Sequence, residues 1–131
     1  MAKRILIVED EPDLIAYFKL ALAQSGCELD VASDGHEAVL RTRELRPDLV
    51  LMDVMRPSIT GIEACRRLYA DPDLTHVRVV MLSSRTEEVR QAACEAGAMD
   101  YWTKPIGPTE LSAKAQSVLE QDSITEAMLT G

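Results

Sequence analysis

Residues 49–57 read LVLMDVMRP, so that four apolar residues lead directly into the carboxylate of Asp53 and a proline follows at position 57. Two other apolar runs have the same character: ILIV at residues 5–8 and VVML at residues 79–82. None of the three alternates apolar with polar positions, a pattern typical of parallel strands that helices cover on both faces. The sequence therefore predicts three buried strands, with Asp53 at the end of the middle one.

Two weaker strand patterns, ELDVA at residues 28–32 and DYWT at residues 100–103, complete a set of five. Amphipathic helix patterns alternate with the strands, beginning at Pro12, Asp34, Gly61, Thr86 and Pro108. Proline suits the first turn of a helix, and Gly97 suits the end of the fourth. Five successive strand–helix units predict an α/β fold, a doubly wound five-stranded parallel sheet flanked by five helices.

The composition limits the class of protein. The chain has 131 residues, of which 47% are hydrophobic and 27% charged, with a formal net charge of -8. This charge argues against direct binding to nucleic acid or to an anionic membrane. No stretch approaches the ~20 apolar residues of a membrane span. Three cysteines without a C-x-x-C pair favour reduced thiols in a cytoplasmic protein, and we interpret them as small core residues.

Polar residues follow four of the predicted strands. Because parallel strands end at one edge of a sheet, these side chains are expected to meet there. Clustered carboxylates need a cation, and Mg²⁺ takes one or two carboxylates and keeps several waters. A lysine and a serine hydroxyl can hold phosphoryl oxygens, and a central carboxylate can form an acyl phosphate. The residues concerned are Glu9, Asp10, Asp53, Ser83, Ser84 and Lys104.

The chain resembles the receiver domain of bacterial two-component response regulators. The matching pieces are ILIVEDEPDL, PDLVLMDVMRPSITG, VVMLSS and AGAMDYWTKPI, in order and with consistent spacing. The resemblance covers residues 3 to about 121 and implies a flavodoxin-like sheet of strand order 2-1-3-4-5. We therefore assign residues 1–121 to a receiver domain and residues 122–131 to a C-terminal tail or the start of a linker.

The resemblance also implies residue roles. Asp53 corresponds to the phospho-acceptor and is also one of the metal ligands. Glu9 and Asp10 correspond to the Mg²⁺ carboxylates, with Asp10 the more direct ligand, and the backbone carbonyl of Met55 is a further ligand. Mn²⁺ is an alternative metal for such a site. Lys104 matches the family's lysine, and the bond from Lys104 to Pro105 is expected to be cis.

Two switch residues follow from the same resemblance. Ser83 matches the hydroxyl that bonds the phosphoryl group, although Ser84 lies beside it. Tyr101 matches an aromatic switch that changes position on activation, with an ordinary core residue as the alternative interpretation. Trp102 stands where a smaller aliphatic residue is common. We expect its side chain to point to the opposite face from Tyr101 and to pack under the last helix.

The implied function is a phosphorylation-controlled switch that shifts the face formed by the fourth helix, fifth strand and fifth helix. It is not a turnover enzyme, since it catalyses only its own phosphotransfer and slow autodephosphorylation. The implied partner is a histidine kinase or a histidine phosphotransfer protein. The effector is undetermined, and a homodimer is compatible with the sequence.

Other function classes fit less well. An aspartyl-nucleophile phosphatase requires a second acid two residues after Asp53, where this chain has Met55. A flavin- or nucleotide-binding protein requires Gly, Ser or Thr in the loop occupied by residues 9–13. The intact acceptor, acids and lysine argue against a degenerate receiver that acts only as an interaction module, and labelling with a phosphodonor decides between the two. The loop after the acceptor also departs from the family pattern, with Arg56 and Thr60 at positions where Met and Asp are common.

Overall fold

The computed structural model describes residues 3–53, 61–83, 87–103 and 106–130. The side chains of residues 53, 83, 87–89 and 121–130 lie outside that description. A single parallel sheet has the strand order β2-β1-β3-β4-β5, which confirms the predicted doubly wound, flavodoxin-like topology. The strands are β1 Arg4–Val8, β2 Glu28–Ala32, β3 Leu49–Asp53, β4 Arg78–Ser83 and β5 Asp100–Thr103.

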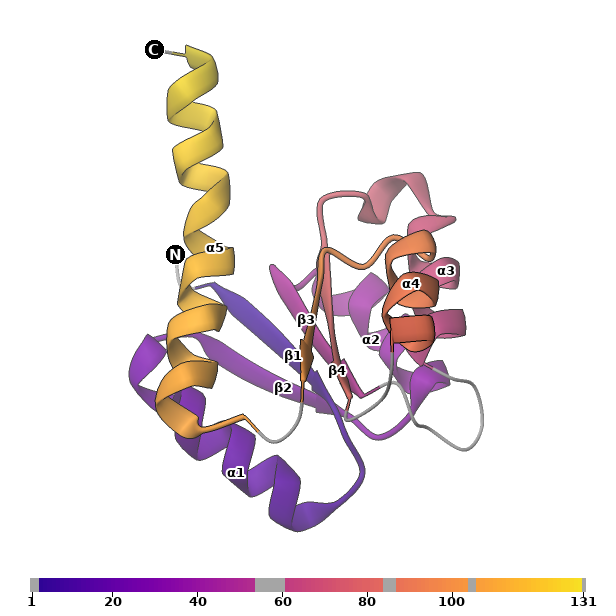
Figure 1. Ribbon diagram of the computed structural model, residues 1–131, viewed down its shortest axis with the longest axis vertical. Helices are drawn as coiled ribbons and strands as arrows, with labels where there is room; N and C mark the ends of the chain where they lie inside the picture. Colours follow the sequence, from indigo (N-terminus) through magenta and orange to yellow (C-terminus); the bar gives the residue numbers. More distant parts are fainter. Residues whose placement is uncertain (1–2, 54–60, 84–86, 104–105, 131) are drawn as a thin grey trace.

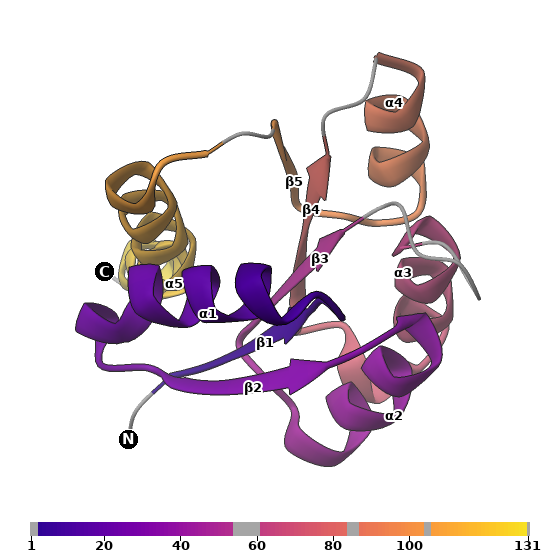
Figure 2. The same ribbon diagram turned by 90° about the horizontal axis from the view of Figure 1, so that it is seen from below.

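Helices cover both faces of this sheet. Seen from below, α1 and α5 lie on one side, and α2, α3 and α4 lie on the other (Figure 2). The helices are α1 Pro12–Leu22, α2 Gly35–Leu45, α3 Gly61–Tyr69, α4 Glu87–Glu95 and α5 Pro108–Thr130, with short 3₁₀ turns at Ala23–Ser25 and Pro72–Leu74. None of the described helices is long and apolar enough to cross a membrane.

Local sequence signals account for several helix ends. Pro12 is the first residue of α1, where its missing N–H costs no hydrogen bond. Asp34 caps α2, because its Oδ1 accepts the N–H of Glu37 at 2.8 Å. Gly97 follows α4 with φ +107°, a conformation that side chains other than glycine rarely adopt.

Each face of the sheet has its own core. Alternate strand residues, including Ile7, Leu51 and Trp102, pack with Leu111 and Ala115 of α5 in one cluster. Their sequence neighbours pack on the other face, in the second cluster, which includes Val8, Met52, Cys65, Leu68 and Tyr101. The two clusters confirm that Tyr101 and Trp102 point to opposite faces and that Trp102 packs against the last helix.

The interpretation of all three cysteines as core residues is wrong. Cys65 is buried, and this burial raises its thiol pKa to about 12. Cys27 is only partly buried, and Cys94 is exposed. Ala93 of α4 and Ala96 just after it are buried, so Cys94 falls on the outer side of the helix.

Tyr69 connects three segments of the chain beside the sheet. Its hydroxyl donates to the Val77 carbonyl at 2.5 Å and accepts the Val79 N–H at 3.2 Å. Its ring lies directly beneath Gly97, since a Cβ added to that glycine would come within 2.6 Å of Tyr69 Cδ2. Burial raises the Tyr69 pKa to about 12, so the phenol stays protonated and able to donate at neutral pH. Tyr69 therefore ties the end of α3 to the start of β4 and to the turn after α4.

The C-terminal helix is longer than the sheet requires. Leu119 is the last residue of α5 described as buried, and the helix continues to Thr130, past the edge of the other layers (Figure 1). The residues predicted as a tail, 122–131, therefore continue α5 as far as Thr130.

Candidate functional site

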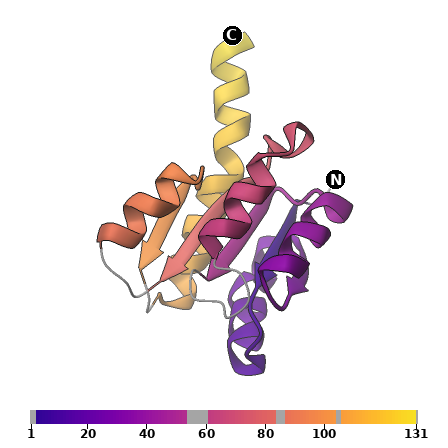
Figure 3. The ribbon, with the colours of Figure 1, turned by 90° about the vertical axis from the view of Figure 1, so that its right-hand side faces the viewer.

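The carboxyl ends of the parallel strands lie along one edge of the sheet (Figure 3). Val8 of β1 pairs with Met52 of β3, so the next residues, Glu9 and Asp53, stand at the same step of neighbouring strands. Neighbouring strands lie about 4.8 Å apart. The register therefore brings the backbones of Glu9 and Asp53 together, as the sequence predicted.

The same alignment holds for the next strands. Asp53 pairs with Leu82, and Ser83 pairs with Thr103. Asp53, Ser83 and Thr103 are each the last residue of a strand, and Lys104 follows Thr103 directly in the chain. Strands β1, β3, β4 and β5 thus deliver the predicted site residues, or their immediate sequence neighbours, to one edge.

Glu9 is the buried acid of this edge, at 1% exposure. Its N–H donates to the Ala32 carbonyl at 2.9 Å and extends the pairing of β1 with β2 by one residue. Its Oε2 accepts the N–H groups of Asp10 at 3.1 Å and Glu11 at 3.2 Å. Two amide donors thus offset part of the cost of burying a charge. The side chain is held at the start of α1, where the helix dipole also favours an anion.

Asp10 is exposed and comes directly before the first turn of α1. Its carboxylate is therefore accessible to a solvated cation, while Glu9 next to it is held in place by the backbone. Two adjacent carboxylates, one buried and one exposed, form a hard oxygen donor set of the kind that Mg²⁺ takes. Among the described side chains, no three His, Cys, Asp or Glu residues cluster to hold a metal. The third predicted acid, Asp53, has its side chain outside that description.

Tyr101 of β5 is buried, with 9% exposure, in the cluster that also contains Ala93 of α4 and Ala96, which follows that helix. Its backbone N–H donates to Asp100 Oδ1 at 2.8 Å. Asp100 Oδ2 accepts the indole N–H of Trp102 at 2.9 Å, and Lys114 Nζ lies 5.7 Å from the centre of the Trp102 ring. β5 is therefore linked to α4 through one side chain and to α5 through the next.

Several predicted features lie outside the described residues. They are Met55, Arg56, Thr60, Ser84 and the Lys104–Pro105 bond. For Asp53 and Ser83 the structure gives the backbone position only. Two contacts that the sequence did not indicate involve β5 and the residues after it: Asp100 with Trp102, and Tyr17 of α1 with the Ile106 carbonyl. Alternation along β5 places the first pair on one face, but no local signal links residues 17 and 106.

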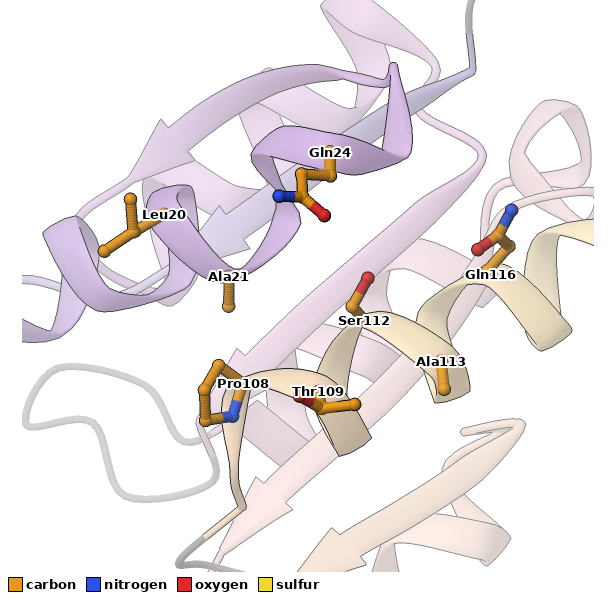
Figure 4. Close-up of a pocket in the computed structure, with 8 residues that line it drawn as sticks. All are labelled: Leu20, Ala21, Gln24, Pro108, Thr109, Ser112, Ala113 and Gln116. Carbon is orange, nitrogen blue, oxygen red and sulfur yellow. The ribbon is translucent and has the colours of Figure 1, made fainter.

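A groove of about 400 Å³ opens elsewhere, between α1 with its 3₁₀ extension and α5 (Figure 4). Its eight lining residues are uncharged, and Leu20 among them is 79% exposed. The groove thus lacks the carboxylates and the cation that phosphoryl chemistry needs. The candidate site is the edge that carries Glu9, Asp10 and Asp53.

Known proteins share this sequence pattern and this fold. The family model of the response regulator receiver domain matches residues 5–116. The DNA-binding response regulator MtrA of Mycolicibacterium smegmatis is 42% identical over 123 residues, which are 93% of this chain and 53% of MtrA. The alkaline phosphatase synthesis transcriptional regulatory protein PhoP of Bacillus subtilis is 36% identical over 95% of this chain and 51% of its own length. The chain thus spans about half the length of these curated relatives.

Solved structures agree with these relatives. A putative response regulator from Chloroflexus aurantiacus superposes with a TM-score of 0.84 at 31% identity, covering 91% of this chain and 98% of the other. The receiver domain of a signal transduction histidine kinase from Syntrophus aciditrophicus gives a TM-score of 0.83 at 33% identity, covering 92% of each chain. The family model covers most of the sequence, and the fold agrees with it, so this chain belongs to the receiver domains of two-component response regulators.

Proposed function

We propose that this chain accepts a phosphoryl group on the carboxylate of Asp53 in a Mg²⁺-dependent reaction. The donor is a histidine kinase, a histidine phosphotransfer protein or a small phosphodonor. The observation that carries the proposal is the strand register, which sets Glu9 and Asp53 at the same step of the sheet edge, with Asp10 next in the chain. The order of strands and the family support the same assignment.

The reaction is a displacement at phosphorus. An Asp53 carboxylate oxygen forms the new bond, while the bond from phosphorus to the donor breaks and its electron pair leaves with the donor. Lys104 holds phosphoryl oxygens as a cation, and Ser83 bonds the phosphoryl group once it is transferred. Glu9, Asp10, Asp53 and the Met55 carbonyl would hold the metal, which would neutralise charge on the phosphoryl oxygens. Mn²⁺ serves as an alternative metal. Slow attack of water on the acyl phosphate returns the free carboxylate.

The signal leaves through the α4-β5-α5 face. Ser83 ends β4 and pairs with Thr103 of β5, and Tyr101 of the same strand is packed beside α4. A change at Ser83 therefore reaches α4 through Tyr101 and reaches α5 through Trp102. The expected response is a shift between two populations of one fold.

This output route predicts which residues respond to activation. Adding Mg²⁺ with beryllium fluoride, an acyl-phosphate mimic, should move amide chemical shifts most within residues 83–115. The measurement is a pair of two-dimensional amide spectra of the labelled chain. Changes confined to the side of α2, for example residues 35–45, would refute the route.

The relatives also bear on partners and on the length of the protein. MtrA is named a DNA-binding response regulator, and this chain spans about half of it. That this chain itself contacts no nucleic acid stays a prediction. It concerns this chain alone and says nothing about DNA binding by those relatives. We assign residues 1–121 to the receiver domain and the rest of α5 to a C-terminal extension, and we place the protein in the cytoplasm.

Labelling with acetyl phosphate tests the proposed chemistry. Intact-mass spectrometry should show the addition of a single phosphoryl group in Mg²⁺ and none in excess chelator. Asp53→Ala should remove the label, because it removes the only proposed nucleophile. A label that survives this substitution, or that forms equally well without metal, would show that the mechanism is wrong. Failure of the parent to take any label would favour a degenerate receiver that acts as an interaction module.

A further inference from the structure

The C-terminal end of α4 is tied to α3 and to β4 by several contacts. Tyr69, the last residue of α3, lies at their centre. We propose that Tyr69 is a positioning residue that fixes this end of α4, so that the helix turns about Gly97 when the domain is activated. This inference rests on the proposed function, in which α4 belongs to the face that carries the signal.

Tyr69 is held by the sheet before it meets α4. Its hydroxyl donates to the Val77 carbonyl at 2.5 Å and accepts the Val79 N–H at 3.2 Å. Its ring is partly buried and packs against the core cluster of that face. An aromatic side chain has only two side-chain torsions, so fixing the hydroxyl leaves the ring little freedom. The ring therefore keeps a defined place relative to β4, although it extends from α3.

The backbone of Gly97, which follows α4, lies against this ring. A Cβ added to Gly97 would come within 2.6 Å of Tyr69 Cδ2 and 3.1 Å of Tyr69 Cε2. The close approach is possible because glycine has no side chain, and the φ of +107° lets the chain leave the helix at this point. The position of the ring thus decides where α4 ends.

Two hydrogen bonds hold the same turn on either side of Gly97. The Cys65 thiol donates to the Ala96 carbonyl at 3.5 Å, and the Met99 N–H donates to the Val79 carbonyl at 2.8 Å. Burial raises the pKa of Cys65 to about 12, so the thiol keeps its proton and stays a donor at neutral pH. The turn is therefore bound to α3 before the glycine and to β4 after it.

The body of α4 has a weaker hold on the sheet. Among the α4 side chains that the structure describes, those of residues 90–95, Ala93 is the buried one and Ala92 is half-buried. Burying a group as small as a methyl contributes only about 0.8 kcal/mol. The helix body is thus easier to displace than its end, and hinges commonly lie at the ends of such elements. These contacts favour rotation about Gly97 over a shift of the whole helix.

A pivot at Gly97 predicts a graded movement along α4. At about 1.5 Å of rise per residue, Arg90 lies about 10 Å from Gly97 along the helix and Glu95 about 3 Å. Activation should therefore displace position 90 about three times as far as position 95. A shift of the whole helix would displace the two positions equally.

Distances between pairs of spin labels measure these displacements. A label on α4, at Arg90→Cys or Glu95→Cys, is paired with a reference label on another helix. The references are Lys19→Cys on α1 and Leu40→Cys on α2, on opposite faces of the sheet (Figure 2). All four side chains are exposed, and the two accessible native cysteines are first replaced by serine. Pulsed electron spin resonance gives each distance before and after adding Mg²⁺ with beryllium fluoride.

Tyr69→Phe tests whether the tyrosine sets the pivot. It keeps the ring but loses both hydrogen bonds to β4 and the residue before it, so the support beneath Gly97 is released. The ratio of the two displacements should fall from about three to below about two. Tyr17→Phe is the matched control, since it also removes a hydroxyl that donates to a backbone carbonyl, but on the other face of the sheet. It should leave the ratio unchanged.

A merely structural role for Tyr69 would lower the melting temperature of Tyr69→Phe without changing the ratio. Equal displacements of the two positions in the parent, an unchanged ratio in Tyr69→Phe, or an equal fall in Tyr17→Phe would each overturn the pivot. Labelling with acetyl phosphate judges the proposed function separately. A parent that takes the label but shows equal displacements keeps the proposed function and loses the pivot. A parent that takes no label would refute the proposed function, and the pivot with it.

Discussion

Asp53→Asn is expected to abolish phosphorylation and, in chelator, to melt a few degrees above the parent. The register sets Asp53 beside Glu9, and Asp10 follows directly, so three carboxylates share one edge of the sheet. Like charges so placed disfavour joint ionisation and destabilise the metal-free fold. An amide keeps the shape of the side chain and removes one of the charges. An acid that served only the structure would behave in the opposite way.

Mg²⁺ should raise the melting temperature of the parent more than that of Asp53→Asn. Mg²⁺ stabilises the native parent by about 1.4 kcal/mol when its free concentration is tenfold above the dissociation constant. The increment should be smaller for Asp53→Asn, because one ligand charge is gone. Thermal melts of both proteins near neutral pH, with Mg²⁺ and with chelator, give the four melting temperatures to compare.

Asp13→Asn is the control for charge alone. Asp13 is an exposed acid in the first turn of α1, so its loss changes the net charge by the same amount. Its interaction with the helix dipole contributes about 0.3–1 kcal/mol, so this variant should melt at or below the parent. If Asp53→Asn in chelator melts no higher than Asp13→Asn, the account of an acidic pocket is wrong.

Gly97→Ala should cost more stability than either Gly26→Ala or Gly107→Ala. Gly97 has φ +107°, which strains any residue with a Cβ, and the new atom would lie 2.6 Å from the Tyr69 ring. The strain costs about 1–3 kcal/mol, and the overpacking adds a similar amount. Tyr69 cannot move freely away, because its hydroxyl is bonded to Val77 and Val79. A total of about 3 kcal/mol lowers the melting temperature by roughly 10 °C.

Substitutions of two other glycines distinguish the cost of backbone strain from the cost of the steric contact with Tyr69. Gly26 has φ +76° with no atom within 4 Å of an added Cβ, so Gly26→Ala should show only the strain, about 1 kcal/mol. Gly107 is open and has no such φ, so Gly107→Ala should be close to neutral. Thermal or denaturant unfolding of the three variants should rank them Gly97, Gly26, Gly107. A Gly97→Ala protein as stable as Gly107→Ala would contradict the close packing of the Tyr69 ring against Gly97.

The strands and the candidate site could be predicted because their signals are local. The apolar runs located β3 and β4 to within a residue at each end, and alternation placed Trp102 under α5. The alignment of Asp53 with Glu9 followed from a rule about parallel strands and needed no distances. Two of the contacts that the sequence did not indicate join segments far apart in the chain. Tyr17 meets Ile106, and Tyr69 meets Gly97, across 89 and 28 residues, and no period in the sequence encodes such pairs.

The misplaced cysteine has a similar cause. Cys94 is small and apolar, and composition alone favours a buried position for it. Its exposure depends on which side of α4 faces the sheet, and Ala93 and Ala96 decide that. The type of a residue alone does not give its position around a helix.

The position of the phosphoryl group is the most direct test of the central claim. After treatment with acetyl phosphate and Mg²⁺, borohydride reduces an aspartyl phosphate to homoserine, which peptide mass mapping can locate. The account predicts homoserine at position 53 in the Mg²⁺ sample and unmodified aspartate there in chelator. Modification at Glu9, Asp10 or another carboxylate, with position 53 unchanged, would contradict it.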